Sequence, residues 1–185
     1  MDQPTDLVVL LDDDELPVGT APRSEVHDAS TPLHLAFSCY LWDHAGRVLL
    51  TRRAVTKRAW PGVWTNSFCG HPRPGESLEM ALARRAYEEL GLAVGDITCV
   101  LPAFRYRAVD PSGVVENEVC PVFVARCAGD AASIHPDPDE VAEWRWVSAD
   151  ELAAAVGAAP WALSPWLVEQ HEQLRRLEDW PGAAR

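Results

Sequence analysis

Apolar and polar residues alternate in short runs along most of the chain, and this pattern predicts strands. The strand-like segments are residues 7–11, 35–42, 48–53, 63–69, 97–106, 118–125 and 143–147. A helical period occurs over Ser77–Leu90, where an apolar residue recurs at every fourth position from Leu78 onward. Many short strands with a few helices predict an α+β fold, with a mixed β-sheet flanked by helices.

Capping residues mark where the predicted helices begin and end. Ser77 is an N-cap residue and Gly91 is suited to the position after the last helical turn. A short helix is expected after Ser148, and Ser164-Pro165 begins a last helix. We therefore expect one domain over residues 1–185, with a strand extension at 1–30 and a C-terminal helix at about 164–178.

Composition narrows the range of functions. The net charge of −12 disfavours binding to nucleic acid or to an anionic membrane. The longest apolar runs are far below the roughly 18 residues that span a bilayer. The run Leu7–Leu11 is followed by acidic residues, so we expect no signal peptide. Five scattered cysteines suggest free thiols in the cytoplasm, and nothing points to an obligate protein partner.

The central helix carries an acidic residue on its apolar row. Glu89 lies about 20° from this row, and Arg85 lies one turn earlier on it. A carboxylate aimed at the core is costly unless it is paired or binds a metal. Two interpretations follow, a buried Arg85–Glu89 pair or a metal ligand. Glu88 lies off the row and is expected to pair with Arg84 in solvent.

A second acidic pair, Glu116 and Glu118, is spaced two residues apart, so in a strand both carboxylates share one face. Like charges side by side favour a bound cation or a shared proton. The pair is either an exposed acidic edge or, because the apolar run Val119–Val124 follows, the mouth of a pocket.

Three histidines, His27, His34 and His71, could complete a metal site with these two glutamates. A single histidine is more often structural, but three histidines with two glutamates suit a divalent transition metal such as Mn²⁺ or Zn²⁺. Cys69 lies beside Gly70, two residues before His71, whereas the other cysteines are interpreted as buried and inert.

Basic residues concentrate between positions 47 and 58 of this acidic chain. The cluster is either a solvated strand edge or a small anion site for phosphate, to which Arg85 would contribute. The cluster consists of Arg47, Arg52, Arg53, Lys57 and Arg58.

The helix and its flanks resemble the Nudix box, a loop–helix–loop that places carboxylates around a divalent metal holding a diphosphate. The matching residues are Gly70, Glu76, Arg84, Ala86, Glu88, Glu89, Gly91 and Leu92. Arg85 departs from the box, because Nudix hydrolases have a glutamate there. This departure weakens the case for hydrolysis of a diphosphate.

Further motifs resemble the type I isopentenyl-diphosphate isomerase family, whose members have the Nudix fold. They include W-T-N-S-F-C-G-H at 64–71, E-N-E-V-C-P-V at 116–122 and Pro160-Trp161, and the resemblance covers about residues 7 to 168. It implies that Cys69 and Glu118 act from opposite faces of the substrate. It also implies that Tyr106 hydrogen-bonds toward Glu118 and that Trp161 faces the hydrocarbon tail.

The same resemblance implies two metal sites and a diphosphate site. One Mn²⁺ or Zn²⁺ is expected on His27, His34, His71, Glu116 and Glu118. One Mg²⁺ is expected with the diphosphate, on Glu89 and the Cys69 carbonyl. The diphosphate contacts are expected to be Arg23, Arg53, Lys57 and Arg85.

The reaction implied is conversion of isopentenyl diphosphate to dimethylallyl diphosphate, a precursor step of isoprenoid synthesis, by protonation and deprotonation through a carbocation. Two alternatives are a Nudix hydrolase of a nucleoside or prenyl diphosphate and a non-catalytic Nudix-like module that binds a phosphorylated ligand. The hydrolase needs a fuller carboxylate cluster than this helix offers, and the binding module would not need Cys69, Glu118 and Trp161 together.

Overall fold

The computed structural model describes residues 6–178 and 180, which form two β-sheets. The first sheet has the order β2 (Pro17–Pro22), β1 (Leu7–Leu11), β3 (His34–Leu35), β10 (Val115–Val119) and β9 (Arg105–Val109). The second has the order β12 (Val141–Val147), β5 (Val48–Arg53), β4 (Phe37–Trp42), β11 (Val122–Cys127) and β8 (Val94–Leu101). Two short strands extend the second sheet, β6 (Trp64–Thr65) beside β5 and β7 (Phe68–Gly70) beside β4.

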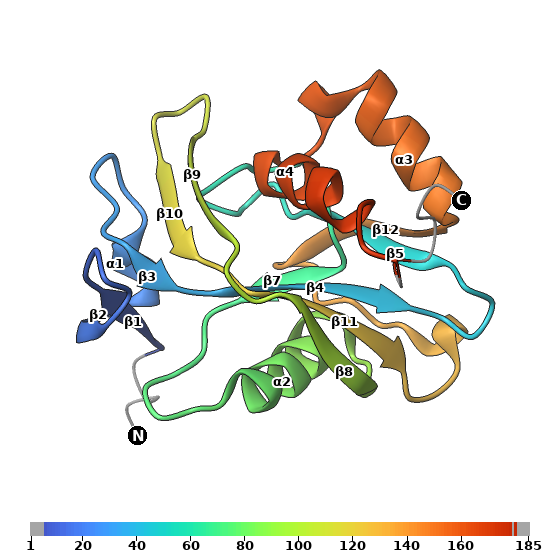
Figure 1. Cartoon of the computed structure of the whole chain (residues 1–185), viewed down its shortest axis with the longest axis horizontal. Helices are drawn as coiled ribbons and strands as arrows, with labels where there is room; N and C mark the ends of the chain where they lie inside the picture. Colours follow the sequence, from blue (N-terminus) through green and yellow to red (C-terminus); the bar gives the residue numbers. More distant parts are fainter. Residues whose placement is uncertain (1–5, 179, 181–185) are drawn as a thin grey trace.

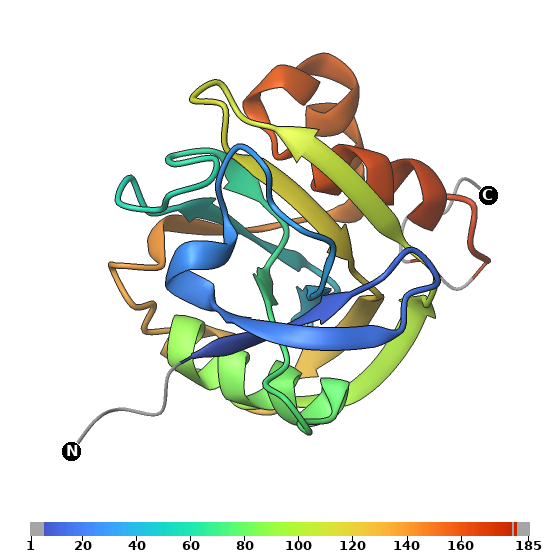
Figure 2. The same cartoon turned by 90° about the vertical axis from the view of Figure 1, so that its left-hand side faces the viewer.

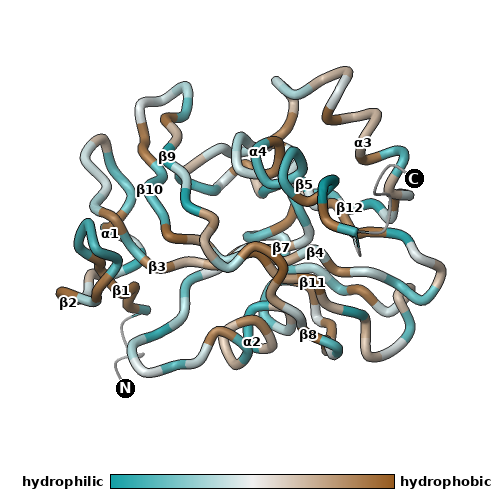
Figure 3. The backbone as a smooth tube through the Cα atoms, viewed as in Figure 1, coloured by the Kyte–Doolittle hydropathy of each residue, from teal (hydrophilic) through white to brown (hydrophobic). Residues whose placement is uncertain are grey.

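Helices cover both faces of the second sheet (Figure 1). The helix α2 (Leu78–Leu90) lies on one face, and α3 (Ala149–Ala158) and α4 (Pro165–Leu174) lie on the other. Each side has its own apolar core, and Figure 3 shows hydrophobic positions concentrated where β4, β8 and β11 meet. Three short turns of helix complete the fold, α1 (Arg23–Val26), η1 (Ala131–Ser133) and η2 (Pro160–Ala162).

The first sheet lies beside this layered body, and Figure 2 shows β1 and β2 crossing its near side. Its small core contains Leu11, Leu33 and Val119. Among the described residues, no helix has the length and apolar character required to cross a membrane.

The predicted α+β class and the central helix are confirmed. Ser77 accepts a hydrogen bond from the Met80 backbone N–H at the start of α2, and Gly91 ends the helix with φ of 66°. Ser148 forms a capping box with Glu151 at the start of α3. These signals are local, which is why the sequence alone was sufficient to find them.

Four predicted strands are each divided in the structure. Residues 35–42 split between β3 and β4 at Ala36, and residues 63–69 split between β6 and β7 at Asn66-Ser67. Residues 118–125 split between β10 and β11 at Cys120-Pro121, because proline has no N–H to continue a ladder. Residues 97–106 split in the same way after Leu101, where Pro102 follows. The last helix ends at Leu174, before the expected 178, as its hydrogen bonds shorten to i→i+3. The strand β2 and the turn α1 were not predicted.

Gly70 is required by packing where β7 meets α2. A Cβ at this position would lie 2.8 Å from Arg85 Cγ and 3.0 Å from Phe37 Cζ. We expect Gly70→Ala to lower the free energy of unfolding by about 1–3 kcal/mol, measured by urea denaturation. The control is Gly157→Ala on α3, where a Cβ meets no atom within 4 Å. Gly157→Ala should stabilise the protein by about 0.5–1 kcal/mol. Equal stability of the two variants would contradict the packing argument.

Candidate active site

Strand register brings the acidic and histidine side chains together. In the first sheet β10 lies between β3 and β9, so Glu118 has His34 as its partner on one side and Tyr106 on the other. His71 follows β7 of the second sheet, and His27 follows the turn α1. Four segments that lie far apart in the sequence therefore converge where the two sheets meet.

The converging atoms form a compact cluster. Glu118 Oε1 lies 3.1 Å from His71 Nε2 and 3.4 Å from His34 Nε2. The two imidazole Nε2 atoms are 3.2 Å apart. Tyr106 donates its phenolic hydrogen to Glu118 Oε2 at 2.9 Å. One atom from each of His27, His34, His71 and Glu118 lies within 4.8 Å of the other three, so this cluster could bind a metal ion.

The remaining predicted ligand, Glu116, lies at the edge of this cluster. Its Oε2 is 3.0 Å from His27 Nε2, yet the two groups are not aligned for a hydrogen bond, and both atoms are buried without another partner. Buried polar atoms normally have partners. His27 Nε2 and Glu116 Oε2 thus lie close together without a hydrogen bond, beside the other imidazoles. A cation shared between them would satisfy both atoms, so the residues present suit a divalent metal.

The electrostatics hold Glu118 and His71 in forms that can bind a metal, whereas they shift His34 toward its protonated form. Burial opposes charge on Glu118, but hydrogen bonds from His34 and His71 hold its pKa well below the usual range. Burial lowers the pKa of His71 to about 4, so this ring is neutral near pH 7. Burial would lower the pKa of His34 as well, but Glu118 outweighs burial and raises it. Burial and the charge of Glu118 raise the pKa of Tyr106, which stays protonated.

The Cys69 thiol is oriented by two neighbours. Its Sγ donates to Asn66 Oδ1 at 3.3 Å and lies 3.4 Å from Ser38 Oγ on the paired strand β4. Both hydrogens of the Asn66 amide nitrogen are bound to backbone carbonyls, which turns its oxygen toward the thiol. Burial raises the pKa of Cys69 to about 11. The thiol therefore carries a proton at neutral pH.

A cavity of about 470 Å³ lies beside the histidine cluster. One part of its wall contains His27, His71 and Glu116. Another part contains Arg23, Arg53, Lys57, Arg58 and Glu140. Three of the four predicted diphosphate contacts therefore share a cavity with three of the predicted metal ligands, whereas Arg47 and Arg52 of the basic cluster pair with Asp43 and Glu143 instead. Cys69 lines a smaller cavity of about 30 Å³ together with Arg53, Lys57, Glu89 and Glu140.

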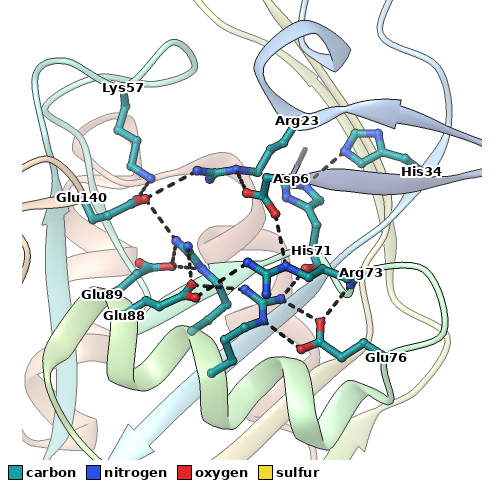
Figure 4. A network of polar contacts seen from close by, with 12 residues as sticks. Asp6, Arg23, His34, Lys57, His71, Arg73, Glu76, Glu88, Glu89 and Glu140 are labelled. Carbon is teal, nitrogen blue, oxygen red and sulfur yellow. Dashed lines mark hydrogen bonds and ion pairs between the residues drawn. The ribbon is translucent and has the colours of Figure 1, made fainter. Parts of the chain in front are cut away.

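The helix α2 contributes a buried ion-pair network (Figure 4). Arg85 donates from Nε to Glu89 at 3.0 Å and from Nη1 to Glu88 at 3.1 Å. The predicted buried Arg85–Glu89 pair is therefore confirmed, as is the Arg84–Glu88 pair at 3.1 Å. The bonds from Arg85 to Glu89 all reach Oε1, so Oε2 remains available to a cation within the part of the chain described here.

Trp161 lies apart from the other predicted site residues. It is on η2, 84% exposed, and lines a separate cavity of about 550 Å³ with Trp60 and Pro111. The buried indole of Trp166 lies nearer the site, 5.6 Å from the Tyr106 ring and under the Arg53 guanidinium at 5.4 Å. A role for Trp161 against the hydrocarbon tail stays a prediction.

Sequence reasoning missed several residues that support the site. Gln170 on α4 donates to Ser38 Oγ at 2.9 Å and accepts from the Tyr40 hydroxyl at 3.0 Å. Glu140, just before β12, contacts the cations of the cavity. No motif or period marks these positions, since each acts through partners far away in the sequence.

The chain matches known proteins along most of its length. A family model described as NUDIX domain matches residues 32–167. The isopentenyl-diphosphate Delta-isomerase of Frankia alni is 62% identical over 165 residues, 89% of this chain and 84% of that protein. The isopentenyl-diphosphate Delta-isomerase of Brevibacterium linens is 56% identical over 172 residues, 93% of each chain.

Solved structures share the fold at lower identity. A Deinococcus radiodurans protein superposes with a TM-score of 0.67 at 20% identity and covers 90% of this chain and 98% of its own. The MutT NUDIX hydrolase from Burkholderia pseudomallei has a TM-score of 0.57 at 24% identity, covering 76% of this chain and 97% of its own.

The mixed sheet with α2 on one face, the box residues on α2 and its flanking segments, and the match of the family model over residues 32–167 define a NUDIX-domain protein. The motifs around Cys69 and Glu118 lie inside the matched region. At 56–62% identity over most of its length, the chain belongs to the isopentenyl-diphosphate Delta-isomerase family.

The histidine cluster predicts a bound ion in the purified protein. Removing one ligand from a small set weakens a metal site severely, so His71→Ala should lose most of the divalent metal that wild type carries, as measured by mass spectrometry of the metal content. His44→Ala, at an exposed turn position, is the control and should match wild type. Equal metal in wild type and His71→Ala would exclude this site.

Proposed function

We propose that the chain converts isopentenyl diphosphate to dimethylallyl diphosphate between the histidine cluster and the cation-lined cavity, with Cys69 and Glu118 transferring the two protons. The observation that carries the proposal is the pairing of opposite protonation states. Burial raises the pKa of Cys69 to about 11, while the histidines keep Glu118 ionised. One group thus holds a proton to give, and the other is free to accept one.

The chemistry needs both groups. Addition of the thiol proton to the terminal carbon of the alkene leaves a tertiary carbocation and a thiolate. Removal of a proton from C2 by Glu118 then forms the new double bond and a protonated carboxyl group. Proton number is restored when Glu118 releases its proton and Cys69 regains one from solvent after the product leaves. Positioned acids and bases of this kind contribute about 10²–10⁴-fold to rate.

Tyr106 supports Glu118 by donating to Oε2. This hydrogen bond fixes the carboxylate and leaves the other oxygen, Oε1, directed toward His34 and His71. Asn66 and Ser38 support Cys69 in the same way by holding the thiol. The two reacting groups are thereby held by separate sets of neighbours: Glu118 by Tyr106, His34 and His71, and Cys69 by Asn66 and Ser38.

Two ions accompany the reaction in this proposal. Mn²⁺ or Zn²⁺ would be held by His27, His34, His71, Glu116 and Glu118, and Mg²⁺ by Glu89 and the Cys69 carbonyl. When bound, the first ion supplies positive charge beside Glu118, and the second neutralises part of the diphosphate charge. The mixed nitrogen and oxygen donors support a transition metal, and a carboxylate with a carbonyl oxygen supports Mg²⁺.

The diphosphate would lie against Arg23, Arg53, Lys57 and Arg85. Arg23, Arg53 and Lys57 line the large cavity, and Arg85 reaches its wall through Glu140. Charge-assisted hydrogen bonds from such groups bind phosphate oxygens strongly. A small anionic substrate and five free thiols support a cytoplasmic location for the reaction.

Exchanging the sulfur of Cys69 for oxygen tests whether this side chain acts as the acid. Cys69→Ser keeps the size of the side chain but replaces the thiol with a far weaker acid, so kcat should fall by about 10³-fold or more. KM should change little, because Cys69 does not hold the diphosphate in this proposal. Turnover is followed as dimethylallyl diphosphate formed by pure protein with Mg²⁺.

The control for this variant is Cys120→Ser. The Cys120 thiol is also 3.4 Å from Ser38 Oγ, yet it lies outside the proposed pair, and its loss should be nearly silent. Near-normal turnover by Cys69→Ser, with normal deuterium incorporation in D₂O, would rule out the thiol as the proton donor.

The lowered pKa of Lys57 predicts that diphosphate binding depends on pH. Burial and the neighbouring arginines lower its pKa to about 8, against the attraction of Glu89. Its charge is present below pH 8 and lost above it, so KM should rise by about tenfold between pH 7 and pH 9 beyond any change from the substrate itself. Lys57→Arg stays charged over this range and should show a flatter profile. Parallel profiles for the two proteins would place the diphosphate away from Lys57.

A further inference from the structure

Glu140 occupies the centre of the cation-lined wall. It immediately precedes β12, and its backbone is fixed on both sides. Its carbonyl accepts from Ala54 N–H at 3.0 Å, and its own N–H donates to Asp137 at 3.0 Å. Asp137 is in turn bonded to the Glu89 carbonyl at 2.9 Å. The side chain is only 14% exposed, so its position is set by the fold.

Three cations from three separate segments converge on this one carboxylate (Figure 4). Glu140 Oε1 lies 3.2 Å from Arg85 Nη2 and 3.8 Å from Arg23 Nη2, and Oε2 is bonded to Lys57 Nζ. Lys57 comes from the turn after β5, Arg23 from α1 and Arg85 from α2. All three belong to the set that the proposed function assigns to the diphosphate.

Cations held this close together and shielded from water repel one another unless an anion lies between them. Glu140 supplies that anion within the protein. A diphosphate in the same cavity would supply several negative charges to the same donors. The carboxylate and the diphosphate therefore compete for the positive groups of the wall.

We propose that Glu140 is an internal counter-anion of the diphosphate site, which holds Lys57, Arg23 and Arg85 in place before substrate arrives and yields these donors to the diphosphate on binding. This inference rests on the proposed function. Substrate and product carry the same diphosphate, so tighter binding of that group does not favour the chemical step. Glu140 thus orders the cations while moderating their affinity for both molecules.

Inorganic pyrophosphate is the probe, with binding measured by calorimetry at pH 7 in a chelator and again with saturating Mg²⁺. Glu140→Gln removes the competing charge and keeps the shape, so pyrophosphate should bind about tenfold more tightly in both conditions. Added pyrophosphate should also raise the Tm of Glu140→Gln more than it raises the Tm of wild type. If Glu140 had only a structural role, Glu140→Gln would show neither the tighter binding nor the larger rise in Tm.

The matched control is Glu143→Gln, three residues further along the chain, on β12. Glu143 pairs with Arg52 at the surface and carries the same charge, but it does not line the cavity. Its loss should leave pyrophosphate affinity unchanged. If Glu140→Gln does not fold, Glu140→Asp decides, because its shorter side chain cannot reach all three cations and should tighten binding about two- to threefold.

Unchanged or weaker pyrophosphate binding in folded Glu140→Gln would overturn the inference. Tighter binding in chelator that reverses with Mg²⁺ would make Glu140 a ligand of the ion and overturn it as well. Lys57→Ala separates this outcome from failure of the proposed function. If Lys57→Ala binds pyrophosphate as tightly as wild type, the diphosphate lies elsewhere, whatever Glu140→Gln shows.

Discussion

The site depends on one parallel alignment, between residues 34–42 and residues 118–126, which passes through both sheets. In the first sheet it pairs His34 with Glu118, and in the second it pairs Ser38 with Val122. Hydrogen bonds from Ala36 N–H to Val119 at 2.9 Å and from Ser38 N–H to Pro121 at 3.1 Å connect the two parts. A slip of one residue would turn every side chain of β10 to its other face. The metal cluster therefore depends on this register, whereas the contact of Ser38 with the Cys69 thiol depends on the pairing of β4 with β7.

Buried charge is the second constraint on this fold. Glu89, Arg85 and Glu118 are all buried, and each has partners of opposite charge or a hydrogen-bond donor. Removing one member of such a set leaves an uncompensated charge, which costs more than the pair contributes. The net charge of −12 does not prevent a cationic wall, because screening limits the effect of distant charges to about 10 Å. Local pairing decides the potential that a bound diphosphate meets.

Much of the fold was readable from the sequence because its signals are local. The period from Leu78 to Leu90, the caps at Ser77 and Gly91, and the acidic turn after β1 all act within a few residues. The proline breaks inside β8–β9 and β10–β11 were missed, because an apolar run hides a change of sheet. A strand of two residues such as β3 has no period to detect.

The site was harder to derive, and the reason is geometric. Spacing placed Glu116 and Glu118 on one face and Glu89 on the buried row of α2, but no spacing relates His27, His34 and His71, which come from separate segments. Resemblance to a family placed these residues in one site. In the structure the register of β3 with β10 aligns His34 with Glu118, and His27 and His71 reach them from two further segments. Glu140 and Gln170 had no signal of either kind.

Arg85 explains how a box typical of diphosphate hydrolysis can serve an isomerase. A hydrolase would use a carboxylate at this position, whereas the arginine here binds Glu88, Glu89 and Glu140. The helix therefore has less free carboxylate with which to gather metal ions around a phosphorus atom. Under the proposed function, Arg85 and Glu89 of α2 help Arg23, Arg53 and Lys57 to hold the diphosphate end of the substrate, and the proton transfers take place at Cys69 on β7 and Glu118 on β10. Binding and chemistry are thus assigned to different side chains, so the same fold can retain a diphosphate while acting on the carbon chain attached to it.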